Sequence, residues 1–252
     1  MGSSRRRATA GSSGAASPIS AVTAGGKWTT YRAMAEDVLD RAMARTTAWA
    51  DRCLAVARPP GQALFEVLTS HPDTRQVRFI AEDLGVITPD VELLRDRFAF
   101  PGIRVLQFGF GDDDFYDGRP WAFRKNLVAY TSTHDNATIV GWYRGETDGT
   151  RTAAQAARER DKVNDYMGHN PSPDYVHFAL IRLAMSTVAD TVIVPVQDVL
   201  GLGNVARMNT PGIPEGNWKF RLLPGQLDDG RIEHLRHVTK LYGRIPKASG
   251  KV

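Results

Sequence analysis

The alternation of short apolar runs with longer stretches of helical period, after residue 62, restricts the fold most. The apolar runs have the length of buried strands, and the stretches between them repeat apolar residues every three or four positions. The predicted strands are 77–81, 103–108, 127–133 and 191–196, and the predicted helices are 88–98, 151–163, 174–189 and 233–244. Strands alternating with helices favour βα units and a parallel sheet, so the predicted fold class is α/β. A (β/α)8 barrel needs eight strands and roughly 250 residues, so about four strands predict half of one.

The N-terminal part differs in composition. Residues 1–26 are rich in Ser, Ala, Gly and Thr, with three arginines and no acid. Such a stretch buries too little apolar surface to offset chain entropy and predicts a disordered tail, although its composition is also typical of an organelle transit peptide. Residues 31–56 are predicted to form an isolated helix, and "RPPGQ" at 58–62 a boundary. The predicted domains are 1–58 (tail and helix), 59–245 (half of a barrel) and 246–252 (a second tail).

Charge and cysteine content exclude several classes of protein. The net charge is +4, but the cations alternate with acids, as in "ARERDK" at 157–162, which is typical of a solvated helix face rather than a nucleic-acid site. Apolar runs stay below the ~18 residues that a membrane span requires. Cys53 is the single cysteine, so a disulfide framework is excluded. We therefore expect no metal, nucleic-acid or membrane partner. The expected location is the cytoplasm, or a plastid if the tail is a transit peptide.

Acidic residues follow two of the predicted strands. Glu82 ends the run in "IAEDLG", and His134 and Asp135 come directly after 127–133. Parallel βα folds carry reactive groups at the carboxyl ends of their strands. Two carboxylates there suit glycosidic bond chemistry, in which one exchanges a proton with the bridging oxygen and the other supports a cationic sugar. The spacing alone favours the other interpretation, in which Glu82 and Asp135 cap the helices that follow them.

Four stretches carry a resemblance to a known family. They are "FIAEDLGVITPDVELLRDRFAFPGIRVLQFGF", "LVAYTSTHDNATIVGWY", "STVADTVIVPVQDVLGLGNVARMNTPG" and "EGNWKFRL". In this order they resemble the C-terminal part of 4-alpha-glucanotransferase (amylomaltase or disproportionating enzyme), glycoside hydrolase family 77, over about residues 59–245. The resemblance implies a (β/α)8 barrel without a coenzyme. It also implies transfer of α-1,4-glucan segments to the 4-hydroxyl of a glucan, maltooligosaccharide or glucose acceptor.

The resemblance also implies roles for individual residues. Glu82 is the expected general acid/base and Asp135 the expected stabiliser of the transition state, with His134 as a hydrogen-bonding neighbour. Trp218 in "EGNW" is the best candidate for stacking on a glucose ring, because sugars present apolar faces to aromatic rings. Asn209 in "MNTPG" is its expected hydrogen-bonding neighbour.

One departure from the family pattern changes the expected activity. The family nucleophile is an aspartate in an Arg-x-Asp-His motif, and residues 1–81 contain no such motif. Retaining transfer proceeds through a covalent intermediate, so we expect these 252 residues alone to be inactive. We also expect them to be poorly stable, because half a barrel exposes sheet edges and apolar surface. The first alternative is a non-catalytic fragment that binds glucan or pairs with a chain supplying the other half barrel. The second, a nucleotide-binding oxidoreductase, rests on Gly201-x-Gly203-x-x-Ala206, which partly matches a dinucleotide fingerprint.

Overall fold

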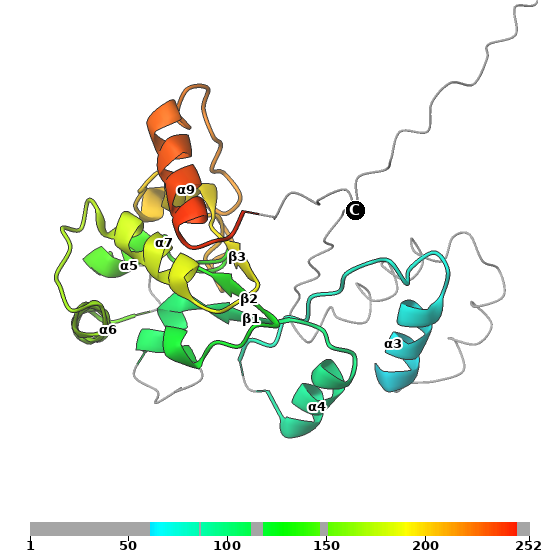
Figure 1. Cartoon of the computed structure of the whole chain (residues 1–252). Coiled ribbons are helices and arrows are strands. Elements are labelled where there is room, and N and C mark those ends of the chain that lie inside the picture. Colours follow the sequence, from blue (N-terminus) through cyan, green and yellow to red (C-terminus); the bar gives the residue numbers. More distant parts are fainter. Residues whose placement is uncertain (1–60, 86, 112–117, 147–150, 246–252) are drawn as a thin grey trace, which may run out of the picture. The chain divides into compact units, whose positions relative to one another are not determined.

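The computed structural model describes residues 61–85, 87–111, 118–146 and 151–245. The predicted tails, the predicted helix 31–56 and the proposed boundary at 58/59 lie outside these ranges. The chain divides into two compact units, Met1–Phe79 and Ile80–Val252. In the first unit, the described residues form one α-helix, α3 (Gly61–Ser70). The second unit contains the sheet and the remaining described helices (Figure 1).

Three parallel strands form the sheet of the second unit. They are β1 (Gly102–Val105), β2 (Leu127–Tyr130) and β3 (Thr191–Ile193), in the order β1-β2-β3. Ile103 pairs with Val128, and Tyr130 pairs with Ile193. All the carboxyl ends therefore lie at one edge of the sheet (Figure 1). The α/β class with a parallel sheet is confirmed.

The strand predicted at 77–81 is not formed. The N–H of Ala81 donates to the carbonyl of Pro101 at 2.9 Å, but the N–H of Ile103, which would donate back to Ala81 in a parallel ladder, donates to the carboxylate of Asp83 at 2.6 Å instead. Val77 and Ile80 are 44% and 37% exposed, unlike residues of a buried strand. The other strands are shorter than predicted. β3, for example, ends before Pro195, which is the N-cap residue of α8 (Val196–Val199).

Four helices agree with the predicted helical segments. They are α4 (Pro89–Arg97), α6 (Ala153–Met167), α7 (Val176–Ser186) and α9 (Asp229–Leu241). Three described helices were not predicted, namely α3, α5 (Ile139–Arg144) and α8. The last two are so short that they show too few apolar repeats to reveal a period. Three 3-10 turns complete the described elements: η1 (Leu106–Phe110), η3 (Pro120–Ala122) and η4 (Asn204–Ala206).

The sheet has two different faces. On the helix face, Ala129 and Val192 pack into apolar clusters, and the main cluster joins residues from α5, α6, α7 and α9. On the opposite face, which we call the open face, Ile103 and Val128 pack with the half-buried Tyr130. The register places Thr191 and Ile193 of β3 on this open face, where both are exposed. A parallel sheet is normally covered on both faces, so the open face is only partly covered in the described part of the chain.

Candidate active site

The two acids of "IAEDLG" have different surroundings. Asp83 is 7% exposed, and its carboxylate accepts hydrogen bonds from the N–H of Ile103 at 2.6 Å and from the guanidinium of Arg95. A third donor, Arg104, lies 3.1 Å from the same carboxylate. Glu82 is exposed. Asp83 therefore fixes the chain to the amino end of β1 and leaves the side chain of Glu82 available.

The charge of Glu82 acts on one residue of the sheet. Tyr130 is the last residue of β2, and its pKa is raised, first by burial and second by the negative charge of Glu82. The neighbour of Glu82, Asp83, is bound at the amino end of β1.

Four of the five residues predicted for the site contact one another. In the loop after β2, Nε2 of His134 lies 3.3 Å from Oδ1 of Asp135. Nδ2 of Asn209 donates to the same oxygen of Asp135 at 2.6 Å. The ring of Trp218 lies against that of His134, with the centroids 5.5 Å apart and the planes inclined by 32°. We call these four residues the Asp135 cluster.

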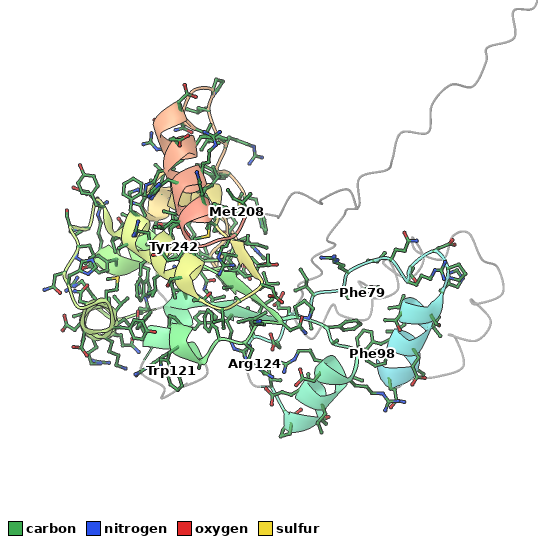
Figure 2. The ribbon with its side chains drawn as sticks, in the orientation of Figure 1. Phe79, Phe98, Trp121, Arg124, Met208 and Tyr242 are labelled. Atoms are coloured by element: carbon green, nitrogen blue, oxygen red, sulfur yellow. The ribbon has the colours of Figure 1, made fainter. Side chains whose placement is uncertain are left out.

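Backbone contacts fix the two loops of the Asp135 cluster. The N–H of Asn209 donates to the carbonyl of His134 at 2.9 Å, and the N–H of Trp218 donates to the carbonyl of Met208 at 2.6 Å. Figure 2 labels Met208 among the side chains of this unit. Trp218 has φ of 61° and is 54% exposed. A large residue in this left-handed conformation is uncommon and points to a constrained position, here with the indole presented to solvent.

Sequence reasoning did not single out two further residues. The guanidinium of Arg207 donates to the carbonyl of Asp135 at 2.6 Å and to that of Asn209 at 2.9 Å. Asp198 in α8 is fully buried, and burial raises its pKa against the opposing effect of its hydrogen bonds. The sequence feature that could have pointed to Asp198 is its place in "VIVPVQD", two residues after the end of the strongly apolar strand predicted at 191–196.

The glycines at 201 and 203 do not form a phosphate cradle. A Cβ on Gly201 would lie 2.6 Å from the ring of His177, and a Cβ on Gly203 would lie 2.7 Å from a carboxylate oxygen of Glu146. The segment that follows is the three-residue turn η4, not a helix that could receive a pyrophosphate. These glycines therefore serve close packing, and the nucleotide-binding alternative loses its structural basis.

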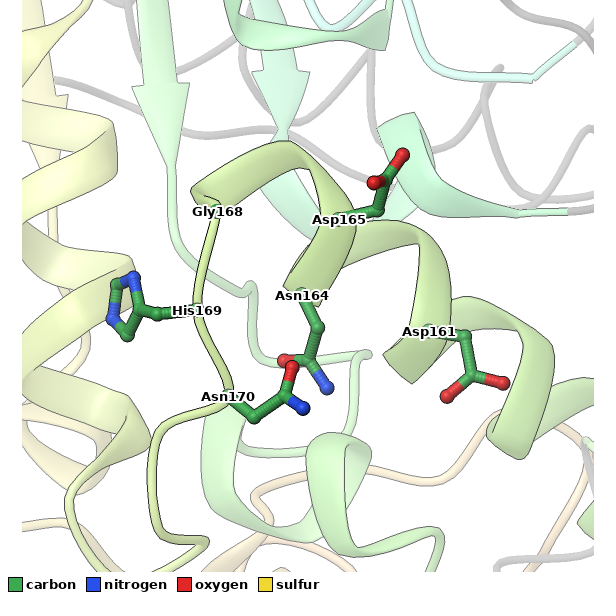
Figure 3. Close-up of a pocket in the computed structure, with 6 residues that line it drawn as sticks. All are labelled: Asp161, Asn164, Asp165, Gly168, His169 and Asn170. Carbon is green, nitrogen blue, oxygen red and sulfur yellow. The ribbon is translucent and has the colours of Figure 1, made fainter.

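A polar pocket lies apart from these residues. It has a volume of about 480 Å³, and the end of α6 and the segment after it line it with Asp161, Asn164, Asp165, Gly168, His169 and Asn170 (Figure 3). Asn164 already accepts a hydrogen bond from the hydroxyl of Tyr143. Within the described ranges, no group of three or more His, Cys, Asp or Glu side chains could hold a metal ion. A search of the same ranges finds no helix with the length and apolar character of a membrane span.

Comparison with known families decides what the chain is related to. The model of glycoside hydrolase family 77, described as 4-alpha-glucanotransferase, matches residues 45–226. The chain belongs to this family. The 4-alpha-glucanotransferase of Synechocystis sp. is 44% identical over 186 residues, which are 73% of this chain and 35% of that protein. The chloroplastic/amyloplastic 4-alpha-glucanotransferase of Arabidopsis thaliana is 39% identical over 74% of this chain and 31% of its own length.

A solved structure supports the membership in family 77. The amylomaltase from Streptococcus agalactiae, in complex with acarbose, superposes with a TM-score of 0.63 at 30% identity. The superposition covers 74% of this chain and 36% of that enzyme. The chain thus spans about a third of the length of the family 77 relatives that it matches.

Proposed function

We propose that residues 59–245 form the C-terminal half of a (β/α)8 barrel. The parallel order β1-β2-β3 and the helices over one face suit part of such a barrel. The open face supports the same view. Exposed Thr191 and Ile193 occupy the side of the sheet that the interior of a closed barrel would bury.

The proposed reaction is that of a 4-alpha-glucanotransferase, namely transfer of an α-1,4-glucan segment to the 4-hydroxyl of a glucan, maltooligosaccharide or glucose. The observation that carries this proposal is the Asp135 cluster at the carboxyl end of β2. There, an aspartate held by Asn209 and His134 lies beside an exposed indole. Hydrogen-bonding groups next to an aromatic face can hold a sugar ring by its hydroxyls and its apolar side.

Each site residue has a proposed role. Asp135 would support the positive charge that develops on the sugar, while His134 and Asn209 bind hydroxyls and Trp218 stacks on a ring. Glu82 would act as the general acid/base. It would protonate the leaving glycosidic oxygen and then remove the proton from the acceptor hydroxyl. Its exposed position near Tyr130 leaves room for a substrate beside it.

The proposal places the nucleophile in polypeptide other than these 252 residues, because residues 1–81 contain no Arg-x-Asp-His motif. The test is a chimera in which residues 59–245 replace the matching part of the Synechocystis enzyme. Incubation with maltotriose should give longer and shorter maltooligosaccharides, whereas the 252-residue chain alone should give none. Glu82→Gln in the chimera should abolish the products, and Glu233→Gln, an exposed change on α9, should leave them. Full turnover in the Glu82→Gln chimera would remove Glu82 from its role.

A second candidate is a non-catalytic glucan-binding fragment or a partner for a separate half barrel. The exposed ring of Trp218 favours it, because stacking needs no nucleophile. Under this alternative, maltotriose binds the 252-residue chain and loses affinity with Trp218→Ala, but the chimera yields no transfer products. The proposed location is the cytoplasm, or a plastid if residues 1–26 act as a transit peptide.

A further inference from the structure

One later stretch of the chain holds the loop between β2 and α5. The loop comprises residues 131–138, and we call residues 198–209 the bracing segment. Four side chains of the bracing segment donate or accept hydrogen bonds along the loop and at the first residue of α5. They are Asp198, Asn204, Arg207 and Asn209. The loop that carries His134 and Asp135 is therefore fixed near both ends and in the middle.

Asp198 makes the largest share of these contacts. Its Oδ2 accepts from the hydroxyl of Thr131 at 2.7 Å and from the hydroxyl of Ser132 at 2.6 Å. Its Oδ1 accepts from the N–H of Ile139 at 2.8 Å. Thr131 and Ile139 are completely buried, as is Asp198 itself. One carboxylate thus joins the end of β2 to the start of α5 and sets the span of the intervening loop.

The three donors favour an acceptor at this position. A carboxylate can accept all three hydrogen bonds. An asparagine has a single accepting oxygen, and its NH₂ group would either face the N–H of Ile139 or make a hydroxyl turn its own O–H elsewhere. Hydrogen bonds to a charged group are the stronger kind, and a buried donor left without its acceptor is destabilised. The N–H of Ile139 is also one of the helix-start donors that lack a partner within the helix.

We propose that Asp198 is a positioning residue of the active site, which sets the placement of His134 and Asp135 through Thr131, Ser132 and Ile139. It lies under the loop and touches no substrate. The inference rests on the proposed function in one respect only, namely that the loop binds a sugar. The position of the loop itself is tested independently.

A matched pair of variants separates hydrogen bonding from packing. Thr131→Ser keeps the hydroxyl that donates to Asp198 and loses a methyl, while Thr131→Val keeps the shape and loses the hydroxyl. In amide NMR spectra of the 252-residue chain, Thr131→Val should shift the signals of residues 133–136. It should also speed hydrogen exchange of the Ile139 amide by about tenfold or more. Thr131→Ser should do neither. If Thr131→Ser perturbs the loop as much as Thr131→Val, the positioning role is overturned.

Two further variants address Asp198 and its second hydroxyl partner. Asp198→Asn should shift the same amide signals more strongly. Ser132→Ala removes only one of the three hydrogen bonds to Asp198 and should shift them less, so it serves if Asp198→Asn does not fold. Asp161→Asn changes the same charge at an exposed position of α6 and should leave them unchanged. Unshifted loop signals in both Ser132→Ala and Thr131→Val would overturn the inference.

Acarbose added to the unmodified chain distinguishes failure of the two proposals. Shifts at His134, Asp135 and Asn209 would support sugar binding by the loop, and their weakening in Thr131→Val would support the link to Asp198. An unperturbed spectrum of the unmodified chain at millimolar acarbose would count against the proposed function. The loop shifts in Thr131→Val would still support the positioning role in that case.

Discussion

Asn209 and Asp135 are 74 residues apart in the sequence, yet Nδ2 of Asn209 lies 2.6 Å from Oδ1 of Asp135. Nε2 of His134 approaches the same oxygen at 3.3 Å. One oxygen of the aspartate is therefore held between two nitrogens from different loops. This arrangement limits the rotation of the carboxylate, as the role proposed for Asp135, to face a developing positive charge, would need.

We predict that Asn209→Ala lowers transferase activity of the chimera by roughly 10- to 100-fold, because Asp135 loses a hydrogen bond of about 1–3 kcal/mol. The rate of maltotriose disproportionation measures the effect. Asn170→Ala, an exposed change in the polar pocket, is the control. Equal rates for the two variants would show that the contact between Asn209 and Asp135 is dispensable.

The buried carboxylate of Asp83 should be important for stability. Asp83→Ala leaves Arg95 and the N–H of Ile103 without their acceptor, and breaking a buried pair costs about 3–5 kcal/mol. Asp96→Ala removes a half-exposed partner of the same arginine and should cost about 0–1 kcal/mol. Urea denaturation of the two variants gives both values. Similar losses in the free energy of unfolding would mean that the buried contacts of Asp83 contribute no more than an exposed ion pair.

Gly102 should not tolerate a side chain. A Cβ there would lie 2.5 Å from Oδ2 of Asp83, a carboxylate that its own partners hold in place, so Gly102→Ala should destabilise the fold by about 1–3 kcal/mol. At Gly111 the nearest neighbour would be a carbonyl oxygen at 3.6 Å, and Gly111→Ala should change stability by less than about 1 kcal/mol. Thermal unfolding of both variants distinguishes the two sites.

His177 makes stability depend on pH. Its pKa is lowered from 6.5 to about 4, first by burial and then by the charges of His234 and Arg231 on α9. The unfolded chain takes up a proton as the pH falls below about 6.5, whereas the folded chain does so only near 4. Stability is therefore complete above about pH 6.5 and is lost progressively down to about pH 4, by on the order of 3 kcal/mol.

Urea denaturation at pH 7, 5.5 and 4.5 measures this loss. His177→Gln should flatten the profile, and His169→Gln, at an exposed position, should not. A profile that keeps its slope in His177→Gln would assign the acid sensitivity to other groups, of which His234 is the first to test.

The place of Asp135 was the most predictable part of the site. Because the reactive loops of a parallel sheet follow its strand ends, the sequence could place His134 and Asp135 directly after β2. The contact between Asn209 and Asp135 was not predicted, since Asn209 was expected beside Trp218.

The place of Glu82 was argued from a strand at 77–81 that is not formed. That prediction was wrong because an apolar run carries no information on where the hydrogen-bond donors of the neighbouring strand point. The N–H of Ile103 donates to the side chain of Asp83 and not to a backbone carbonyl.

Burial of individual acids was the least predictable part. Nothing in the composition of "IAEDLG" distinguishes Glu82 from Asp83, and the distinction depends on Arg95 and Ile103, which lie 12 and 20 residues from Asp83. The same holds for Asp198, whose donors lie 59 to 67 residues earlier in the chain. Contacts over such separations depend on the packed fold and not on a local pattern.

The close approach of Gly102 to Asp83 limits how this enzyme family could be re-engineered. Moving only the six residues of "IAEDLG" into another scaffold would carry over Glu82 and Asp83. It would leave behind Arg95 and Gly102, which keep Asp83 buried. Grafting has to include the whole stretch from residue 80 to residue 104, because Glu82, the proposed acid/base, depends on the contacts of Asp83 for its position.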